Sequence, residues 1–219
     1  MKRHILLILC LACSGLALAQ KDWTEKPINW GFKVGVNSMI PDARVKTEYG
    51  ILNTTSINKV GYQTEGFVRM NVGRLFFQPE FAYCYSSENI QLLTEHNILH
   101  TSFDINMHTF DATGIVGYNT VKEGPYILSA FAGCKVKYAY QIDVEPANTG
   151  KYTEMHSLYN LYITTGLSTT ISHVFFDFRY DIALFNNSVG INNYASISYG
   201  EISLNRRSNM LSFSLGFMF

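Results

Sequence analysis

Residues 174–183 read VFFDFRYDIA, and this stretch decides the fold of the chain. Because successive side chains of a β-strand point to opposite faces, its residues divide into two sets. Asp177, Arg179 and Asp181 fall on one face, and the other face is apolar. The stretch therefore predicts a strand that separates a polar environment from an apolar one. The apolar face consists of Val174, Phe176, Phe178, Tyr180 and Ile182.

The same alternation recurs along the chain, mostly in runs of about 9–13 residues, the length that a tilted strand needs to cross a bilayer. Helical periodicity is nowhere convincing, and only 5 prolines interrupt the sequence. The pattern therefore predicts an all-β chain of eight strands. They are expected at 30–38, 60–72, 75–86, 103–120, 125–141, 160–171, 174–183 and 209–219.

The connections between these runs alternate in length. In an up-and-down series, this alternation puts all long loops at one end and both termini at the other. Bacterial outer-membrane barrels have this asymmetry, with short periplasmic turns and long extracellular loops. We therefore predict an antiparallel up-and-down transmembrane barrel with periplasmic termini. The short connections are Gly73-Arg74, 121–124 and Ser172-His173, and the long ones are 39–59, 87–102, 142–159 and 184–208.

Alternation alone fits both a soluble barrel with an apolar interior and a membrane barrel with an apolar exterior. The charged face also carries small residues such as Gly166 and Gly216, which suit a crowded interior. Basic residues facing lipid would cost roughly 2–4 kcal/mol each near the midplane, against a domain stability of about 5–15 kcal/mol. The membrane form is therefore predicted, with a lumen that side chains fill. The expected lumen ion-pair network is Lys33, Glu65, Arg69, Glu80, Asp111, Lys135, Lys137, Asp177, Arg179 and Asp181.

The beginning of the chain has the layout of a secretory signal peptide. Lys2 and Arg3 precede an apolar run, which ends in the small-x-small sequence Ala17-Leu18-Ala19. We expect Sec-dependent export to the bacterial outer membrane, with cleavage after Ala19. A short periplasmic segment at 20–29 and the barrel at 30–219 would follow. A lipoprotein anchored through Cys13 is the alternative.

The charge of the mature chain argues against nucleic acid as a partner. Without Lys2 and Arg3 it has 15 basic and 17 acidic residues, a net charge of −2. Such a chain offers no polybasic surface. The two cysteines outside the signal peptide, Cys84 and Cys134, are too few for a disulfide framework.

One run is irregular. In FDINMHTFDATGIVGY at 103–118, Ile105 and Met107 share one face, whereas the apolar residues from Phe110 onward share the other. This change of phase predicts a β-bulge near His108-Thr109. Strand-like patterns at 51–57 and 194–204 also predict outer hairpins that project beyond the bilayer.

Some loop residues are candidates for chemistry. His96 and His100, with Glu95 beside them, have a spacing that suits a metal on a helix, but no helical pattern accompanies them. His156 and Ser157 resemble the dyad of a lipid hydrolase, although neighbours on a strand point in opposite directions.

Other candidates lie in or beside the strands. Asp177, Arg179 and Asp181 fit either a proton relay or ion pairs that fill the lumen. His108 fits a base or a bulge residue, and Arg206-Arg207 fit either contacts to lipopolysaccharide phosphates or solvated side chains. The sequence has no glycine-rich phosphate loop, zinc motif or nucleophile elbow. We expect no catalytic residues, metal or cofactor.

The sequence resembles the PorT-like outer-membrane β-barrel family of Bacteroidetes over essentially the whole mature chain. The most specific segments are FFQPE at 76–80 and the aspartate-arginine-tyrosine strand near the end, and TFDATGIVGY at 109–118 departs from the usual LDIPLLLGY-like form. The other segments that carry the resemblance are WGFKVGVN at 30–37, GPYILSAFAG at 124–133 and LSFSLGFMF at 211–219.

The resemblance implies an eight-stranded barrel of the OmpA and OmpX type. Ending on Phe219 is similar to the C-terminal signal for barrel insertion, here Leu215, Phe217 and Phe219. The implied partners are outer-membrane lipid and lipopolysaccharide, the barrel insertion machinery, and secretion or envelope proteins. Three functions stay open: a non-enzymatic barrel for envelope structure or recognition, an accessory barrel of a secretion apparatus, and a small barrel hydrolase.

Overall fold

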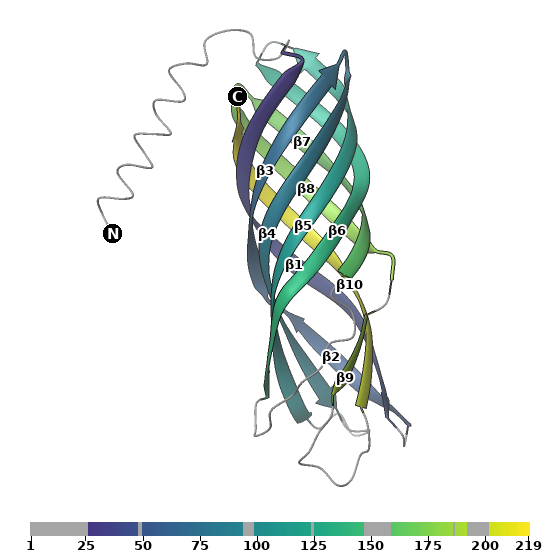
Figure 1. The fold of residues 1–219 in the computed structure, drawn as a ribbon. Helices are drawn as coiled ribbons and strands as arrows, with labels where there is room; N and C mark the ends of the chain where they lie inside the picture. The colour runs from purple at the N-terminus through teal and green to yellow at the C-terminus, as the bar shows by residue number, and fades with distance from the viewer. Residues whose placement is uncertain are drawn as a thin grey trace, which may run out of the picture.

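The computed structural model of the chain is a closed barrel (Figure 1). It describes residues 26–47, 50–93, 99–123, 125–146, 159–185, 187–191 and 202–219, so the predicted signal peptide lies outside the described residues. Eight antiparallel strands follow one another in chain order, and β1 pairs with β10 to close the ring. This confirms the predicted all-β, up-and-down barrel. The ring consists of β1 (Ile28–Thr47), β3 (Val60–Val72), β4 (Leu75–Leu93), β5 (Leu99–Glu123), β6 (Tyr126–Pro146), β7 (Tyr159–Ile171), β8 (Val174–Ala183) and β10 (Ile202–Met218).

Short turns join the ring strands at the end of the barrel that also holds Phe219, here called the turn end. Gly73 and Ser172 have φ values of 62° and 56°, the left-handed conformation that tight hairpin turns require. β5 continues to Glu123 and β6 begins at Tyr126, so the turn predicted at 121–124 is wrong in its first three residues, which belong to β5.

Two further strands lie at the opposite end, here called the loop end (Figure 1). β2 (Gly50–Asn58) pairs with β1 and with β4, and it covers the strand-like pattern predicted at 51–57. β9 (Asn187–Ile191) pairs with β10. Most of the pattern at 194–204 lies outside the described residues.

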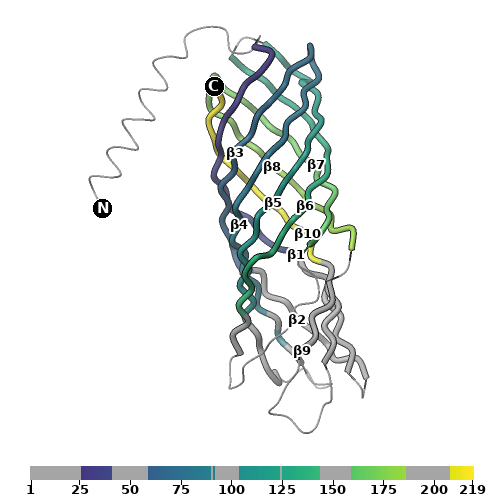
Figure 2. Tube along the Cα trace, viewed as in Figure 1, coloured from purple at the N-terminus to yellow at the C-terminus, as the bar shows by residue number. Residues whose placement is uncertain are grey.

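The strands wind around the barrel with a common tilt (Figure 2). Stepping from Ser38 of β1 through the paired residues of each successive strand leads back to β1 at Ile28, ten residues away. A stagger of this size in eight strands corresponds to a tilt of about 40–45°, typical of small barrels. This stagger also determines which residues of different strands lie at the same height in the lumen.

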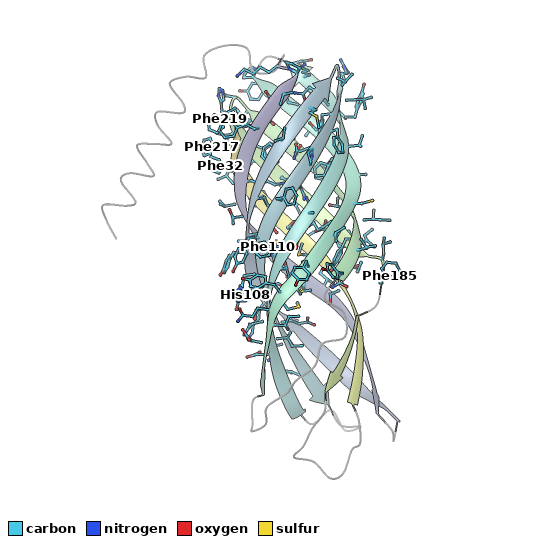
Figure 3. All side chains as sticks on the ribbon, viewed as in Figure 1. Phe32, His108, Phe110, Phe185, Phe217 and Phe219 are labelled. Atoms are coloured by element: carbon cyan, nitrogen blue, oxygen red, sulfur yellow. The ribbon has the colours of Figure 1, made fainter. Side chains whose placement is uncertain are left out.

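Inward and outward side chains alternate along each strand, and the exterior is apolar. Val34 and Leu167, for example, are each 55% exposed. Two groups of aromatic residues frame this band: Phe32, Phe217 and Phe219 lie toward the turn end, and Phe110 and Phe185 lie toward the loop end (Figure 3). Outward positions on β1 run from Trp30 to Ile40, which spans about 25 Å at this tilt and matches the apolar band of outer-membrane barrels. The described residues contain no helix that is long and apolar enough to span a membrane.

Phenylalanines fill the turn end of the lumen by packing on glycines of neighbouring strands. Phe67 lies opposite Gly31, Phe76 opposite Gly117, and Phe131 opposite Gly166. A methyl group on Gly117 would come within 2.1 Å of the Phe76 ring. These positions must therefore be glycine for the rings to lie flat against the wall.

The register shift predicted near His108-Thr109 is present, but the extra residue lies in β6 and not in the run at 103–118. Ile105 and Met107 are buried on the same inward face as Asp111, so β5 keeps its phase through this region. The register shift at His108/Thr109 comes from an extra residue in β6, because His108 pairs with Gln141 and Thr109 with Ala139. Tyr140 of β6 is therefore the bulged residue.

Candidate functional site

The centre of the lumen holds a cluster of five charged side chains, called here the mid-lumen cluster: Lys33, Glu65, Glu80, Asp177 and Arg179. Lys33 Nζ lies 2.6 Å from Asp177 Oδ2, 3.0 Å from Glu80 Oε1 and 3.2 Å from Glu65 Oε2. These carboxylates come from β3, β4 and β8, so one ammonium group on β1 joins four walls of the barrel. All five side chains are buried.

Arg179 and Glu80 close the lumen at this level. Arg179 Nη1 donates to Glu80 Oε2 at 2.7 Å, and Nη2 donates to Glu80 Oε1 at 3.2 Å. β8 and β4 are four strands apart in either direction around the eight-stranded ring, so this paired contact spans the diameter of the barrel. Such two-point contacts are the strong form of charge pairing.

A second group lies nearer the loop end and is called here the loop-side cluster: Asp111, Lys135, Lys137 and Asp181. Lys135 pairs directly with Asp181, and Asp111 Oδ2 lies 3.9 Å from Lys135 Nζ and 3.8 Å from Lys137 Nζ. The Lys137 ammonium also lies 3.5 Å from the Met210 sulfur. The two positive and two negative charges of the loop-side cluster balance.

Arg69 has a different environment nearer the turn end. Its guanidinium lies 4.2 Å from the centre of the Phe76 ring and 5.1 Å from that of Phe175. Its Nε donates to Gln78, and Gln78 in turn donates to Glu80. Gln78 therefore links the Arg69 charge to the mid-lumen cluster, where three carboxylates face two cations.

The seam between the first and last ring strands is closed by backbone and aromatic contacts. Phe219 N donates to Trp30 O at 2.8 Å, and Trp30 N donates to Phe219 O at 3.2 Å. Outside the barrel, the two rings stack with centroids 4.9 Å apart, and Phe32 lies 5.9 Å from Phe217. Leu215 is also outward-facing. These contacts leave no free edge at the seam, as hydrocarbon requires.

Residues 18–189, most of the chain, match the sequence model of the outer membrane protein beta-barrel domain. The chain belongs to this family. It is therefore a barrel of the bacterial outer membrane, and its apolar exterior is the lipid-facing surface.

Solved outer-membrane barrels share the fold. OprG from Pseudomonas aeruginosa is 10% identical with a TM-score of 0.63, and the match covers 89% of this chain and 97% of OprG. AlkL, whose structure was determined in lipid bilayers, is 8% identical with a TM-score of 0.54, covering 87% of this chain and 90% of AlkL. No sequence match was found among proteins with curated descriptions.

The uncharged residues of the lumen network in this outer membrane barrel were not predicted from the sequence. Gln63 Nε2 donates to Glu65 at 2.6 Å and to Ser214 at 3.0 Å, and Gln78 bridges Arg69 and Glu80. Both glutamines lie on the same inward face of their strands as the charged residues. This alternation in the sequence could have identified them as members of the lumen network. Glu88 was assigned to a loop, but it is fully buried near the end of β4.

The other candidates do not join the lumen. His108 lies on the outer surface near the loop end, with its Nδ1 2.7 Å from the Tyr83 hydroxyl (Figure 3). Glu95, His96, His156 and Ser157 lie outside the described residues, as do the side chains of His100, Arg206 and Arg207. Within the described part of the chain, no group of His, Cys, Asp and Glu could hold a metal ion.

Proposed function

We infer that the protein is a non-enzymatic outer membrane barrel that is closed to solutes and acts through contacts at its loop end, in envelope structure or recognition. The Arg179–Glu80 contact carries this proposal, because it joins opposite walls at the centre of the lumen. Phenylalanine and glycine pairs fill the level below it, and the loop-side cluster fills the level above. A lumen filled in this way leaves the ends of the barrel as the available surfaces.

The loop end is the larger of these surfaces. β5 and β6 continue beyond the level of Phe110, and β2 and β9 add strands there (Figure 1). Loops placed on a rigid scaffold are where binding residues concentrate. The alternation of short turns and long connections supports an extracellular position for this end.

Site-specific photo-crosslinking in intact cells tests this proposal. A crosslinker at Lys59 or Asp143, both exposed near the loop end, is expected to capture a discrete protein or glycan. Leu167, exposed in the apolar band, is the matched control and is expected to capture lipid. Adducts of lipid alone at all three positions would contradict a role in recognition.

The resemblance to PorT-like barrels favours a second candidate, an accessory barrel of a protein secretion apparatus. Deletion of the gene followed by analysis of the secreted proteins tests it. Loss of one class of secreted proteins is expected under this candidate. An unchanged set of secreted proteins with intact loop-end crosslinks would leave envelope recognition as the function. The hydrolase alternative depends on His156 and Ser157, which lie outside the described residues.

A further inference from the structure

Aromatic rings cover the outside of the barrel near the loop end, over β3, β4, β5 and β6. Tyr62 and Tyr85 stack with ring centroids 5.0 Å apart. Phe110 and Tyr140 stack at the same distance. His108 joins the two pairs, because its ring lies 5.0 Å from that of Tyr85 and 6.1 Å from that of Tyr140. The rings form one continuous surface, called here the outer aromatic face: Tyr62, Tyr83, Tyr85, His108, Phe110 and Tyr140.

The outer aromatic face lies on one side of the barrel. Among the described residues, the ring-to-ring contacts near the loop end all come from β3 to β7. Outward positions near the loop ends of β8, β10 and β1 carry aliphatic side chains such as Ile182, Leu211 and Ile40, with Phe185 as a separate ring (Figure 3). Anchoring at the membrane surface does not require such an asymmetry, so the face suits a specific ligand.

Polar side chains border the face on its loop-end side. The Tyr85 hydroxyl and Ser87 Oγ both donate to Asn106 Oδ1, at 3.1 Å and 2.7 Å. These bonds use the Asn106 oxygen, and its amide nitrogen has no acceptor among the described residues. Asn89 Nδ2 donates to Asp104 at 2.6 Å, and Asn89 Oδ1 accepts no hydrogen bond from the described part of the chain. This border therefore has hydrogen-bonding capacity that the protein does not use.

The wall on the other side of the face carries small side chains. Phe110 lies at the loop-end edge of the apolar band (Figure 3), and Ala112 and Gly114 follow it on the outward face of β5. Ala132 lies outward on the neighbouring strand β6. A methyl group on Gly114 would meet only a Phe77 ring atom, at 3.9 Å. An acyl chain can therefore lie close against this wall, directly beside the rings.

A sugar that carries acyl chains fits these features better than a phospholipid. Sugar hydroxyls exchange hydrogen bonds with amides, and sugar C–H groups pack on the electron-rich faces of aromatic rings. Phosphate groups bind instead to arginine and lysine. Among the described residues that border the face, the lysine is Lys59, and it is already paired with Asp104 at 2.9 Å. The chemistry of the face therefore favours a sugar over a phosphate.

We propose that the outer aromatic face binds the sugar headgroup of a glycolipid in the outer leaflet. The rings pack on the sugar, the Asn106 amide donates to a hydroxyl, and an acyl chain lies against the small residues of β5 and β6. This inference deepens the proposed function by naming a ligand class, and it rests on the extracellular placement of the loop end.

Native mass spectrometry of the full chain in detergent, titrated with dephosphorylated lipid A, tests the proposal. This probe is an acylated amino-sugar disaccharide without phosphate. Wild-type protein is expected to be half-saturated at a several-fold lower concentration of this probe than of phosphatidylglycerol. Tyr85→Leu/His108→Leu, which removes two rings of the face, is expected to raise that concentration about tenfold. The matched control is Phe32→Leu/Phe217→Leu, an outward pair of rings at the turn end, and it is expected to leave the concentration unchanged.

Different results would overturn the proposal for different reasons. Equal binding of the two lipids would indicate an unselective aromatic belt, and equal effects of the two double variants would place the binding elsewhere. Binding of phosphorylated lipid A without binding of the dephosphorylated form would show that phosphate is recognised. Equal binding of the disaccharide without acyl chains would show that the ligand is a free glycan.

A second measurement needs no variant. In NMR spectra of the full chain in lipid bilayers, dephosphorylated lipid A is expected to shift the side-chain amide signal of Asn106. Asn209, which faces outward on β10 across the barrel, is the matched control and is expected to keep its signal. No shift at Asn106, or equal shifts at both residues, would overturn the proposal. Loss of the crosslinks at Asp143 with retained lipid binding would contradict only the proposed function, so the two failures are distinguishable.

Discussion

Lys33 and Asp177 are 144 positions apart in the chain, and their charged atoms lie 2.6 Å apart at the centre of the barrel. The contact links β1 to β8 across β10, so it can form only when the ring is closed. Lys33 also contacts Glu65 and Glu80, so it contacts all three carboxylates of the mid-lumen cluster, as Arg179 does. The stability of the barrel should depend on it.

We predict that Lys33→Met lowers the free energy of unfolding by about 3–5 kcal/mol, because removing one partner leaves buried carboxylates uncompensated. Equilibrium unfolding in urea from lipid bilayers measures it. The control is Lys59→Met, whose exposed pair with Asp104 should contribute less than about 1 kcal/mol. Equal losses in the two variants would contradict a special role for the buried contact.

We predict that Gly117→Ala destabilises the barrel by about 1–3 kcal/mol, because the added methyl group would overlap the Phe76 ring. Gly66→Ala is the matched control, since a methyl group there meets no atom within 4 Å. The temperature at which heated samples change mobility in detergent gels reports the difference. If Gly66→Ala proved as damaging as Gly117→Ala, the Phe76 contact would not be the cause.

We predict that Phe219→Ala reduces the fraction of chains that insert into the outer membrane, because it removes the stacking on Trp30 at the seam. Such a stacked pair contributes about 0.5–1.5 kcal/mol beyond the area it buries. Phe213→Ala, an outward-facing phenylalanine in the middle of β10, is the control and should insert normally. Quantitative comparison of folded and unfolded bands from membrane fractions measures this, and equal defects would argue against a terminal insertion signal.

We predict that the hydrogen bonds to Asp104 near the loop end lose their stabilising effect at acidic pH. Hydrogen bonds from Asn89 and Lys59 lower the pKa of Asp104, so they favour the ionised carboxylate in the folded state. Their stabilising contribution is therefore present above the usual aspartate pKa of about 4 and is lost as the pH falls through the lowered value. NMR titration of the Asp104 carboxyl should show a midpoint below that usual value, and Asn89→Ala should raise it. An unchanged midpoint in Asn89→Ala would show that another group lowers the pKa.

The faces of the strands could be predicted from sequence because hydrocarbon and a filled lumen select opposite side chains at alternate positions. The bounds predicted for 60–72 and 174–183 agree with β3 and β8, and the structure places all ten charges of the expected network in the lumen. Which of these charged side chains form ion pairs with one another could not be predicted. The contact between Lys33 and Asp177 depends on the ten-residue stagger of the ring. The sequence of a single strand contains no information about this stagger.

The bulge predicted near His108-Thr109 is present, but it was assigned to β5 and lies in β6, and this has a physical reason. Ile105 and Met107 face inward, whereas Asp104, Asn106 and His108 face outward, so the polar and apolar faces of β5 exchange roles near His108 without any change in backbone phase. An exchange of this kind looks the same in sequence as an inserted residue. The bulge at Tyr140 of β6 shows no such signal, because a tyrosine suits either side of an interface.

The exchange of faces in β5 has a use beyond this chain. Where a long strand leaves hydrocarbon and enters water, polar groups become favourable outside and apolar groups become favourable inside. The residue at which the two patterns cross therefore marks the depth of the membrane surface. In the longest strand of a related sequence, the residue at this crossing point gives an estimate of where the lipid headgroups begin. It also indicates how much of the protein extends beyond the membrane surface.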